Sequence, residues 1–381
     1  MKWCSAAALL LALMHSQESQ ANNVSAKISG GSLYVYGDSA NNHITIRSTS
    51  AGSVTVTGTT TTVNGVSGPV VLNGWNNGIF VYLAGGNDSV WLQAGDVIGA
   101  THFDLGSGDD RALLGSSDSL PEELLLDPLF ELIFPGADEL ATSMLRLRQS
   151  LTVLGFAGAD TVTVTNCTVA GFATFDTAGG ADEVYFGSDA GEVLTYFQNS
   201  VVIVPGSETD IVSIGDVQIN RDLTIDDPTH ASSVDLFNSR VGGNLQIFTS
   251  LAADSVTLED LVVTGFVKSI LKDGSDSIDC TNVRAKQMEV FLGTGDDKSV
   301  LTNVQLERLW AYLEEGNDNF KIDQSRVTTS YYFGAGGNDF FTIQNTTGSN
   351  AYVYGDGGTD SLKRSGNSIG KFYVYTIEKN L

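Results

Sequence analysis

Basic residues are scarce in this sequence: Lys and Arg together number 20, against 45 Asp and Glu, which gives a formal net charge of −25. A nucleic-acid-binding surface needs many cations to neutralise phosphates, so this composition argues against nucleic acid as a partner. The acidic residues recur along the whole chain rather than in one tail. They therefore belong to the fold, and their sign favours divalent cations or cationic partners.

Apolar runs long enough to cross a membrane are also lacking. The run Ala6–Met14 near the N-terminus is too short to span a bilayer. Lys2 precedes this run, and the small residues Ser19 and Ala21 follow it, which is typical of a secretory signal peptide over residues 1–21. We therefore expect a mature chain from residue 22 that is secreted or held at the cell surface and is not transmembrane.

Proline is rare, with 6 residues, whereas glycine is frequent, with 42. Val, Ile and Thr recur throughout the chain. This mixture favours strands joined by glycine turns over helices.

A Gly-x-Asp turn returns along the chain at a nearly constant interval. The segment Gly86-Asn87-Asp88 reappears as Gly337-Asn338-Asp339. The interval is 22 residues from Asp88 to Asp110, from Asp160 to Asp182 and from Asp254 to Asp276, and 21 residues through Asp276, Asp297, Asp318, Asp339 and Asp360. Asp210 belongs to the same column, and Ser232 takes the place of the aspartate in one degenerate coil.

Alternating apolar residues follow each Asp, as at Val162 and Val164 or Phe341 and Ile343, and a similar run precedes each turn. Alternation over four to six residues is the pattern of a strand with one buried face. A period of about 21 residues built from short strands is one coil of a parallel β-helix. The predicted fold is all-β: a single-domain parallel β-solenoid over residues 22–381, with about 12–14 coils of 21–22 residues.

A second column keeps the same register. Six residues after the repeated Asp come Asn166, Asp216, Asn238, Asp260, Asn282, Asn303 and Asn345. Asn and Asp tolerate the left-handed conformation that a tight turn requires. We expect this column to form a ladder of side-chain amides at a second turn.

The register also bears on Cys167 and Cys280, the two cysteines outside the leader. They fall in different columns, five coils apart, which is roughly 24 Å along a solenoid axis. That separation excludes a disulfide, and both are expected to be buried thiols.

Two regions depart from the repeat. Residues 116–149 contain Pro-led acidic segments that end at Arg146 and Arg148, which predicts a helical insertion that either covers the coils or docks a partner or a second copy. Residues 50–75 hold Thr- and Val-rich strands that are expected to start the stack.

The repeated turns resemble the glycine-aspartate nonapeptide of haemolysin-type (RTX-like) calcium-binding proteins. The resemblance rests on a Gly two residues before the Asp and an apolar residue two residues after it, as at Gly337 and Phe341. It implies Ca²⁺ held between stacked turns by backbone carbonyls and by carboxylates. The implied ligands are Asp88, Asp110, Asp160, Asp182, Asp276, Asp297, Asp318, Asp339 and Asp360.

This chain departs from the family pattern because each coil carries one Gly-Asp turn rather than two. The alternative without an ion is also open, since an Asp after a glycine turn can simply accept hydrogen bonds from backbone N–H groups.

No catalytic residue is predicted. The bases Arg221, Arg284 and Lys286 are scattered along the sequence, and the histidines are isolated. Aromatic residues such as Tyr352 and Tyr373 are interpreted as strand residues rather than as a platform for sugars.

The favoured function is a structural or adhesive extracellular solenoid stabilised by Ca²⁺, with a polysaccharide, a surface protein or a second copy as the unknown partner. The alternative is a carbohydrate-active β-helix enzyme, either a polysaccharide lyase or a hydrolase.

Overall fold

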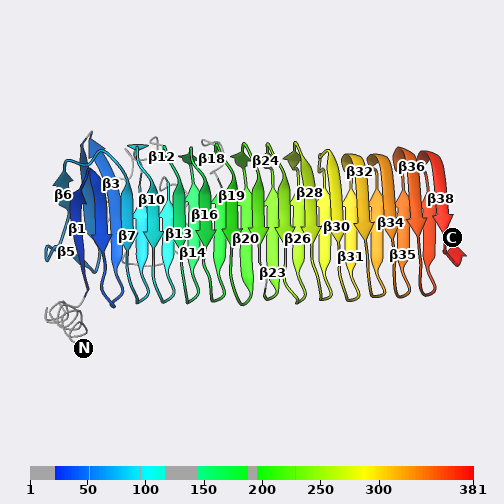
Figure 1. Cartoon of the computed structure of the whole chain (residues 1–381), viewed down its shortest axis with the longest axis horizontal. Coiled ribbons are helices and arrows are strands. Elements are labelled where there is room, and N and C mark those ends of the chain that lie inside the picture. The colour runs from blue at the N-terminus through cyan, green and yellow to red at the C-terminus, as the bar shows by residue number, and fades with distance from the viewer. Residues whose placement is uncertain (1–21, 51, 94–95, 116–144, 188–194, 228) are drawn as a thin grey trace, which may run out of the picture.

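The computed structural model describes residues 22–50, 52–93, 96–115, 145–187, 195–227 and 229–381. The predicted signal peptide, residues 1–21, and residues 116–144 of the predicted insertion lie outside the described residues. The described chain is a parallel β-solenoid of about 12 turns, so the predicted fold class is confirmed (Figure 1).

Two sheets run the length of the rod, and a third, narrower sheet covers only its middle part. Sheet 1, in spatial order, contains β5 (Thr62–Val63), β1 (Asn23–Ser29), β2 (Ser32–Tyr36), β7 (Ile79–Tyr82), β10 (Thr101–Asp104), β13 (Leu151–Leu154), β16 (Ala173–Asp176), β19 (Val201–Val204), β22 (Leu223–Asp226), β25 (Leu245–Phe248), β28 (Phe266–Ile270), β30 (Gln287–Phe291), β32 (Gln305–Tyr312), β34 (Arg326–Phe333), β36 (Thr347–Tyr354) and β38 (Ser368–Tyr375).

Sheet 2 contains β6 (Val70–Asn73), β4 (Ser53–Gly58), β3 (His43–Ser50), β8 (Ser89–Leu92), β11 (Arg111–Leu114), β14 (Thr161–Thr165), β17 (Glu183–Gly187), β20 (Asp210–Gly215), β23 (Ser232–Phe237), β26 (Ser255–Glu259), β29 (Ser277–Thr281), β31 (Lys298–Thr302), β33 (Asn319–Asp323), β35 (Phe340–Gln344), β37 (Ser361–Ser365) and β39 (Lys379–Asn380). Sheet 3 is narrower and contains β9 (Asp96–Val97), β12 (Leu145–Leu147), β15 (Cys167–Val169), β18 (Thr195–Phe197), β21 (Val217–Ile219), β24 (Arg240–Val241) and β27 (Val262–Val263).

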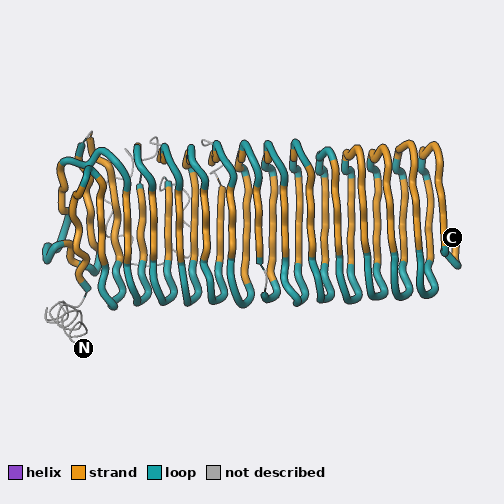
Figure 2. Tube along the Cα trace, viewed as in Figure 1, coloured by secondary structure: helices purple, strands orange, loops and turns teal. Residues whose placement is uncertain are grey.

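Each coil crosses the rod in the same order. A sheet 1 strand leads into the Gly-Asp turn, a sheet 2 strand follows, and a short second turn leads through sheet 3 back to sheet 1. Figure 2 shows these two series of turns as the two long edges of the rod, with the short strands of sheet 3 along the upper edge. In the last coils β32, β34, β36 and β38 are each eight residues long, because the strand at the second turn continues directly into sheet 1.

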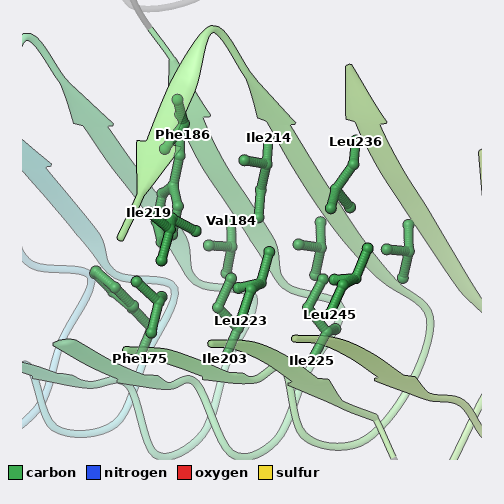
Figure 3. Close-up of a cluster of buried hydrophobic side chains, with 14 of the residues drawn as sticks. Phe175, Val184, Phe186, Ile203, Ile214, Ile219, Leu223, Ile225, Leu236 and Leu245 are labelled. Atoms are coloured by element: carbon green, nitrogen blue, oxygen red, sulfur yellow. The ribbon is translucent and has the colours of Figure 1, made fainter. Parts of the chain in front are cut away.

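The core lies between sheets 1 and 2, where alternate residues of most strands point inward. Val184 and Ile214 of sheet 2 face Ile203 and Leu223 of sheet 1 in the middle of the rod, and Phe186 packs at about 4.7 Å from Phe175 between ring centroids (Figure 3). A fully buried aliphatic or aromatic side chain contributes about 1.5–3 kcal/mol, so stacking these columns is the main source of stability.

The first strands close the N-terminal end of the core. β1 pairs antiparallel with β2, and β3, β4 and β6 form an antiparallel group, whereas β2 and β3 pair in parallel with the first full coil through β7 and β8. Residues 53–73 therefore start the stack as expected, but as a folded-back cap rather than as another coil.

The structure corrects the prediction for the C-terminal end of the insertion. Residues 145–149 were expected to finish a helix, but Leu145–Leu147 forms β12, which pairs in parallel with β15. Leu145 and Leu147 are fully buried and alternate with the exposed Arg146. The alternation of buried and exposed residues is the pattern of a strand. Burial of the two leucines in the stack therefore outweighs the arginines, which had suggested the end of a helix.

Candidate functional site: an aspartate ladder

All nine aspartates predicted as calcium ligands lie along one edge of the rod, where the Gly-Asp turns enter sheet 2. Each of them is buried, with at most 3 % exposure. The Oδ1 atom of each accepts a hydrogen bond from the backbone N–H of the residue at the same position one coil earlier, at 2.7–3.0 Å between N and Oδ1. Asp210 and Asp254 accept in the same way.

We call this series the Asp ladder: Asn42, Asp88, Asp110, Asp160, Asp182, Asp210, Ser232, Asp254, Asp276, Asp297, Asp318, Asp339 and Asp360.

Both ends of the Asp ladder are closed by other residues. Asn42 takes the first position, where its N–H donates to Asp88 and its Oδ1 accepts from the N–H of Asp38 at 3.0 Å. At the last position, the N–H of Asp360 donates to Oε2 of Glu378 at 2.7 Å. The N–H groups at both ends therefore find side-chain oxygens, in part-buried contacts at Asp38 and Asp360 and in a buried contact at Asn42. A fully buried N–H left unpaired would cost about 1–3 kcal/mol.

The second carboxyl oxygen has no partner. Oδ2 of every predicted ligand, and of Asp210, is buried without a hydrogen bond. In three coils Oδ2 lies against the backbone five residues earlier. A Cβ added at Gly155, Gly334 or Gly355 would stand 2.0 Å, 2.4 Å or 2.3 Å from Oδ2 of Asp160, Asp339 or Asp360, respectively. The ladder thus holds a row of buried oxygens that need a proton or a cation.

Burial favours the neutral form of these carboxyls. Desolvation raises the pKa of Asp88, Asp160 and Asp318 to about 8, although the N–H donated from the preceding coil opposes the rise. The same cause raises the pKa of Asp182 and Asp276 to about 7, and that of Asp110, Asp297 and Asp339 to about 6. For Asp360 the pKa is also raised, again chiefly by burial.

The coil that has Ser232 in place of the repeated Asp carries a buried carboxylate at a different position. Ser232 stands in the Asp ladder, and Asp227, five residues earlier, occupies a place that is Leu or Gly in several coils, as at Leu313 and Gly334. Asp227 is fully buried, and neither carboxyl oxygen has a hydrogen bond. Burial, followed by the charge of Asp210, raises the pKa of Asp227 to about 7. The repeat pattern did not point to this residue, although the loss of Asp at 232 was a signal for it.

A second ladder runs outside the first and was also missed. The residue before the repeated Asp accepts from the N–H of its counterpart one coil later, as from Asn317 to Asp296 at 2.8 Å and from Asn338 to Asn317 at 3.0 Å. This outer series is exposed. In this outer series the N–H of the later coil donates to the earlier coil, whereas in the Asp ladder the N–H of the earlier coil donates to the later coil. Neighbouring turns are therefore joined by hydrogen bonds in both directions. The recurrence of Asn or Asp before the repeated Asp could have revealed it.

The predicted column at the second turn is confirmed. Asn166, Asp216, Asn238, Asp260, Asn282, Asn303 and Asn345 all have φ between 45° and 58°, the left-handed conformation. Several of their side chains form a ladder at the surface, in which Nδ2 of Asn303 donates to Oδ1 of Asn282 at 2.7 Å and Nδ2 of Asn282 to Oδ1 of Asp260 at 2.8 Å. Cys167 and Cys280 are separate buried thiols, also as expected.

The residues of the Asp ladder fit a calcium ion only in part. Ca²⁺ takes six to eight oxygen ligands. The unpaired Oδ2 atoms are suitable donors, but each Oδ1 already accepts a backbone N–H. In the part of the chain that the structure describes, no three His, Cys, Asp or Glu side chains gather in a way that could hold a metal. Any ion would have to complete its shell with backbone carbonyl oxygens.

Aromatic side chains form two further columns on the outer face of sheet 1. One contains Phe291, Tyr312, Phe333, Tyr354 and Tyr375, and the other Trp310, Tyr331, Tyr352 and Tyr373. Neighbouring rings within a column lie 4.5–5.9 Å apart between centroids and within 9° of parallel. Because each ring covers the face of the next, ring edges rather than faces are presented outward.

Comparison with known proteins gives no relative from which a function could be carried over. No family model, curated protein or solved structure matches the chain. Among the residues that the structure describes, no helix has the length and apolar character to cross a membrane. The function must therefore be argued from the solenoid itself.

Proposed function

We propose that this protein is a secreted or cell-surface structural and adhesive β-solenoid. The observation that carries the proposal is that its regular side chains serve coil-to-coil stacking. The Asp ladder lies inside, exposed ladders lie at both turns, and aromatic columns lie on one outer face. A rigid rod with repeating faces suits a scaffold or an adhesin, because stability adds up coil by coil while the faces remain free for contacts.

A carbohydrate-active enzyme has no comparable support. Stacking on a sugar requires the face of an aromatic ring, and the faces inside these two columns are covered by neighbouring rings. A recess of about 420 Å³ lies at the C-terminal end of the rod, between Arg364, Phe372 and Leu381. Its lining contains no carboxylate side chain and no histidine, so it lacks the usual groups for acid–base catalysis.

The location is tested by following the full-length chain in the cell. The proposal expects export with removal of about the first 21 residues, which N-terminal sequencing of the mature protein measures. An intact N-terminus and retention in the cytoplasm would contradict it.

We further propose that Ca²⁺ stabilises the rod between stacked turns. The run from Asp276 to Asp360 is the best candidate, because each of its five turns carries both the Gly and the Asp of the repeat. What supports the proposal is the row of unpaired buried oxygens, whose mutual repulsion in the charged form a divalent ion would relieve.

A thermal melt at pH 8 with chelator or with an excess of Ca²⁺ tests this. An ion that binds only the folded state raises the melting temperature as its concentration rises. Mg²⁺ at equal ionic strength is the control for screening. An unchanged melting temperature would refute the calcium proposal and leave protons as the neutralising species, without affecting the scaffold role.

A further inference from the structure

The outer face of sheet 3, together with the segments that continue it in the later coils, aligns basic residues that are far apart in the sequence. β24 pairs in parallel with β27 so that Arg240 lies beside Val262. Isolated bridges then continue from Val262 to Arg284 and from Arg284 to Gln305, and Gln305 pairs with Arg326. The column therefore places an arginine on every second coil: Arg240, Arg284 and Arg326. Since neighbouring coils are about 4.8 Å apart, successive arginines recur at roughly 10 Å.

These arginines have no ion-pair partner within the described chain. All three are exposed, and none forms an ion pair with a described residue. Other cations of the molecule do find acids: Arg148 pairs with Asp96 on the same sheet, and Lys321 pairs with Asp323 on sheet 2 at 3.3 Å. The column is thus an unneutralised line of charge on a chain whose net charge is −25.

Further cations flank the column. Lys286 follows Arg284 by two residues, Arg308 follows Gln305 by three, and Arg221 lies one coil before Arg240. Acids are fewer on these coils between the second turn and sheet 1; they are Asp216, Asp222, Asp260 and Glu307. Asp216 and Asp260 already accept amide hydrogen bonds from Asn238 and Asn282. We call this surface the arginine column face, defined by Arg240, Arg284 and Arg326 with Lys286 and Arg308.

We propose that the arginine column face binds an extended acidic polysaccharide, with one anionic group for about every two coils. The inference deepens the adhesive part of the proposed function and rests on it. Charge complementarity selects an anionic partner, and the line of arginines selects a linear one. Guanidinium groups also hold carboxylates and sulfates through paired hydrogen bonds, which lysine cannot do.

The charge density of the rod argues against nucleic acid as this partner. Double-stranded DNA carries one negative charge for every 1.7 Å or so of its axis, several-fold denser than one arginine for roughly every 10 Å. The remaining phosphates would face a strongly acidic molecule. A polymer with widely spaced charges meets the arginines without that repulsion.

The test uses the full chain and hyaluronan, which has one carboxylate in each disaccharide, at low and at physiological ionic strength. We expect binding at low salt that weakens as salt screens the contacts. Replacing all three arginines (Arg240→Gln, Arg284→Gln, Arg326→Gln) should weaken binding on the order of tenfold, as three exposed ion pairs would. The matched control removes three exposed cations of sheet 2 that form no ion pair with a described residue (Arg47→Gln, Arg111→Gln, Lys363→Gln) and should bind like the unmodified chain.

Several outcomes would overturn the proposal. They are no binding of the unmodified chain to hyaluronan at low salt, equal losses in both triple variants, or tighter binding to double-stranded DNA than to hyaluronan. Equal melting temperatures of the variants show that folding is not the cause of a loss. Sedimentation without polymer provides a further check, because concentration-dependent association that the arginine variant abolishes would assign the face to a second copy instead. Export of the chain is measured separately, so a failure of polymer binding leaves the scaffold role testable by itself.

Discussion

At the scale of single residues, the Asp ladder makes a clear distinction between its two carboxyl oxygens. Oδ1 is required as an acceptor for the N–H of the preceding coil, whereas Oδ2 is buried without a partner. Asn42, at the first position, carries an amide, but its Oδ1 accepts from the N–H of Asp38 in the same coil, and only its backbone N–H donates to the ladder. An amide at an interior position would still offer Oδ1 to the N–H of the preceding coil.

This leads to a prediction for Asp318, an interior member of the ladder. Asp318→Asn keeps the acceptor for the N–H of Asp297 and should change the free energy of unfolding at pH 7 by less than about 1 kcal/mol. Asp318→Ala leaves that N–H buried and unpaired and should cost about 1–3 kcal/mol. Denaturant unfolding of both variants measures the difference. Equal destabilisation by Asn and by Ala would contradict the role of Oδ1.

The exchange between Asp227 and Ser232 gives a second prediction. Restoring the common pattern with Asp227→Leu and Ser232→Asp together should stabilise the chain at pH 8, because a buried carboxyl with two unpaired oxygens is removed and a ladder acceptor is gained. Ser232→Asp alone should destabilise it, since two buried carboxyls would then meet. A double-mutant cycle by denaturant unfolding measures the coupling. Additive effects would show that the two positions do not compensate for each other.

Much of the ladder could be predicted at this scale, and some of it could not. A constant interval places the repeated aspartates in one column, because each coil returns to the same place in the section of the rod. The interval does not say which way a side chain points or what it bonds. The N–H group that donates to each Oδ1 belongs to the backbone of another coil, and Asp227 lies outside the repeat pattern. Neither feature could be predicted without the structure.

At the scale of elements, the turns control how closely the coils approach. Gly337 has φ of 122°, and a Cβ there would lie 1.7 Å from the carbonyl oxygen of Gly316 in the preceding coil. Only glycine fits such an approach. The Gly of the repeat is therefore explained by stacking alone, and its presence does not by itself require an ion.

The second turn allows a finer test at Asn303, whose φ is 53°. Asn303→Gly should be tolerated, because glycine adopts this conformation freely. Asn303→Val should cost about 1–2 kcal/mol, because a β-branched residue is strained there. Thermal melts of the two variants compare them directly. A valine variant as stable as the glycine variant would mean that the ladder does not depend on the left-handed turn.

The elements that the sequence pattern misplaced lie where the repeat is weakest. β12 was interpreted as the end of a helix because Arg146 and Arg148 resemble a helix terminus, yet Leu145 and Leu147 are buried in the stack. The 21–22-residue interval between the repeated aspartates also does not predict the antiparallel cap of β1, β3, β4 and β6. Local signals fail at both places because contacts with other coils determine the conformation.

At the scale of the whole molecule, the many buried carboxyls give stability a common dependence on pH. Their pKa values in the folded chain, about 6 to 8, exceed the value near 3.9 of an unfolded Asp. Folding thus favours the protonated form, so this contribution to stability is full below about pH 4 and is lost as pH rises through 6 to 8. Asp38 and Asp296, whose pKa values are lowered by donated hydrogen bonds, act oppositely: their contribution is full above about pH 4 and is lost as pH falls through their folded pKa values.

The most direct test of the Asp ladder is therefore the unfolding midpoint of the full chain between about pH 5 and pH 9, measured in chelator at constant ionic strength. We predict the highest midpoint near pH 5 and a continuous fall through about pH 6 to 8, as the buried carboxyls lose their protons. A midpoint that stays level or rises over this range would show that the ladder carboxylates are charged and satisfied in the folded state, and would contradict a ladder held together in its protonated form.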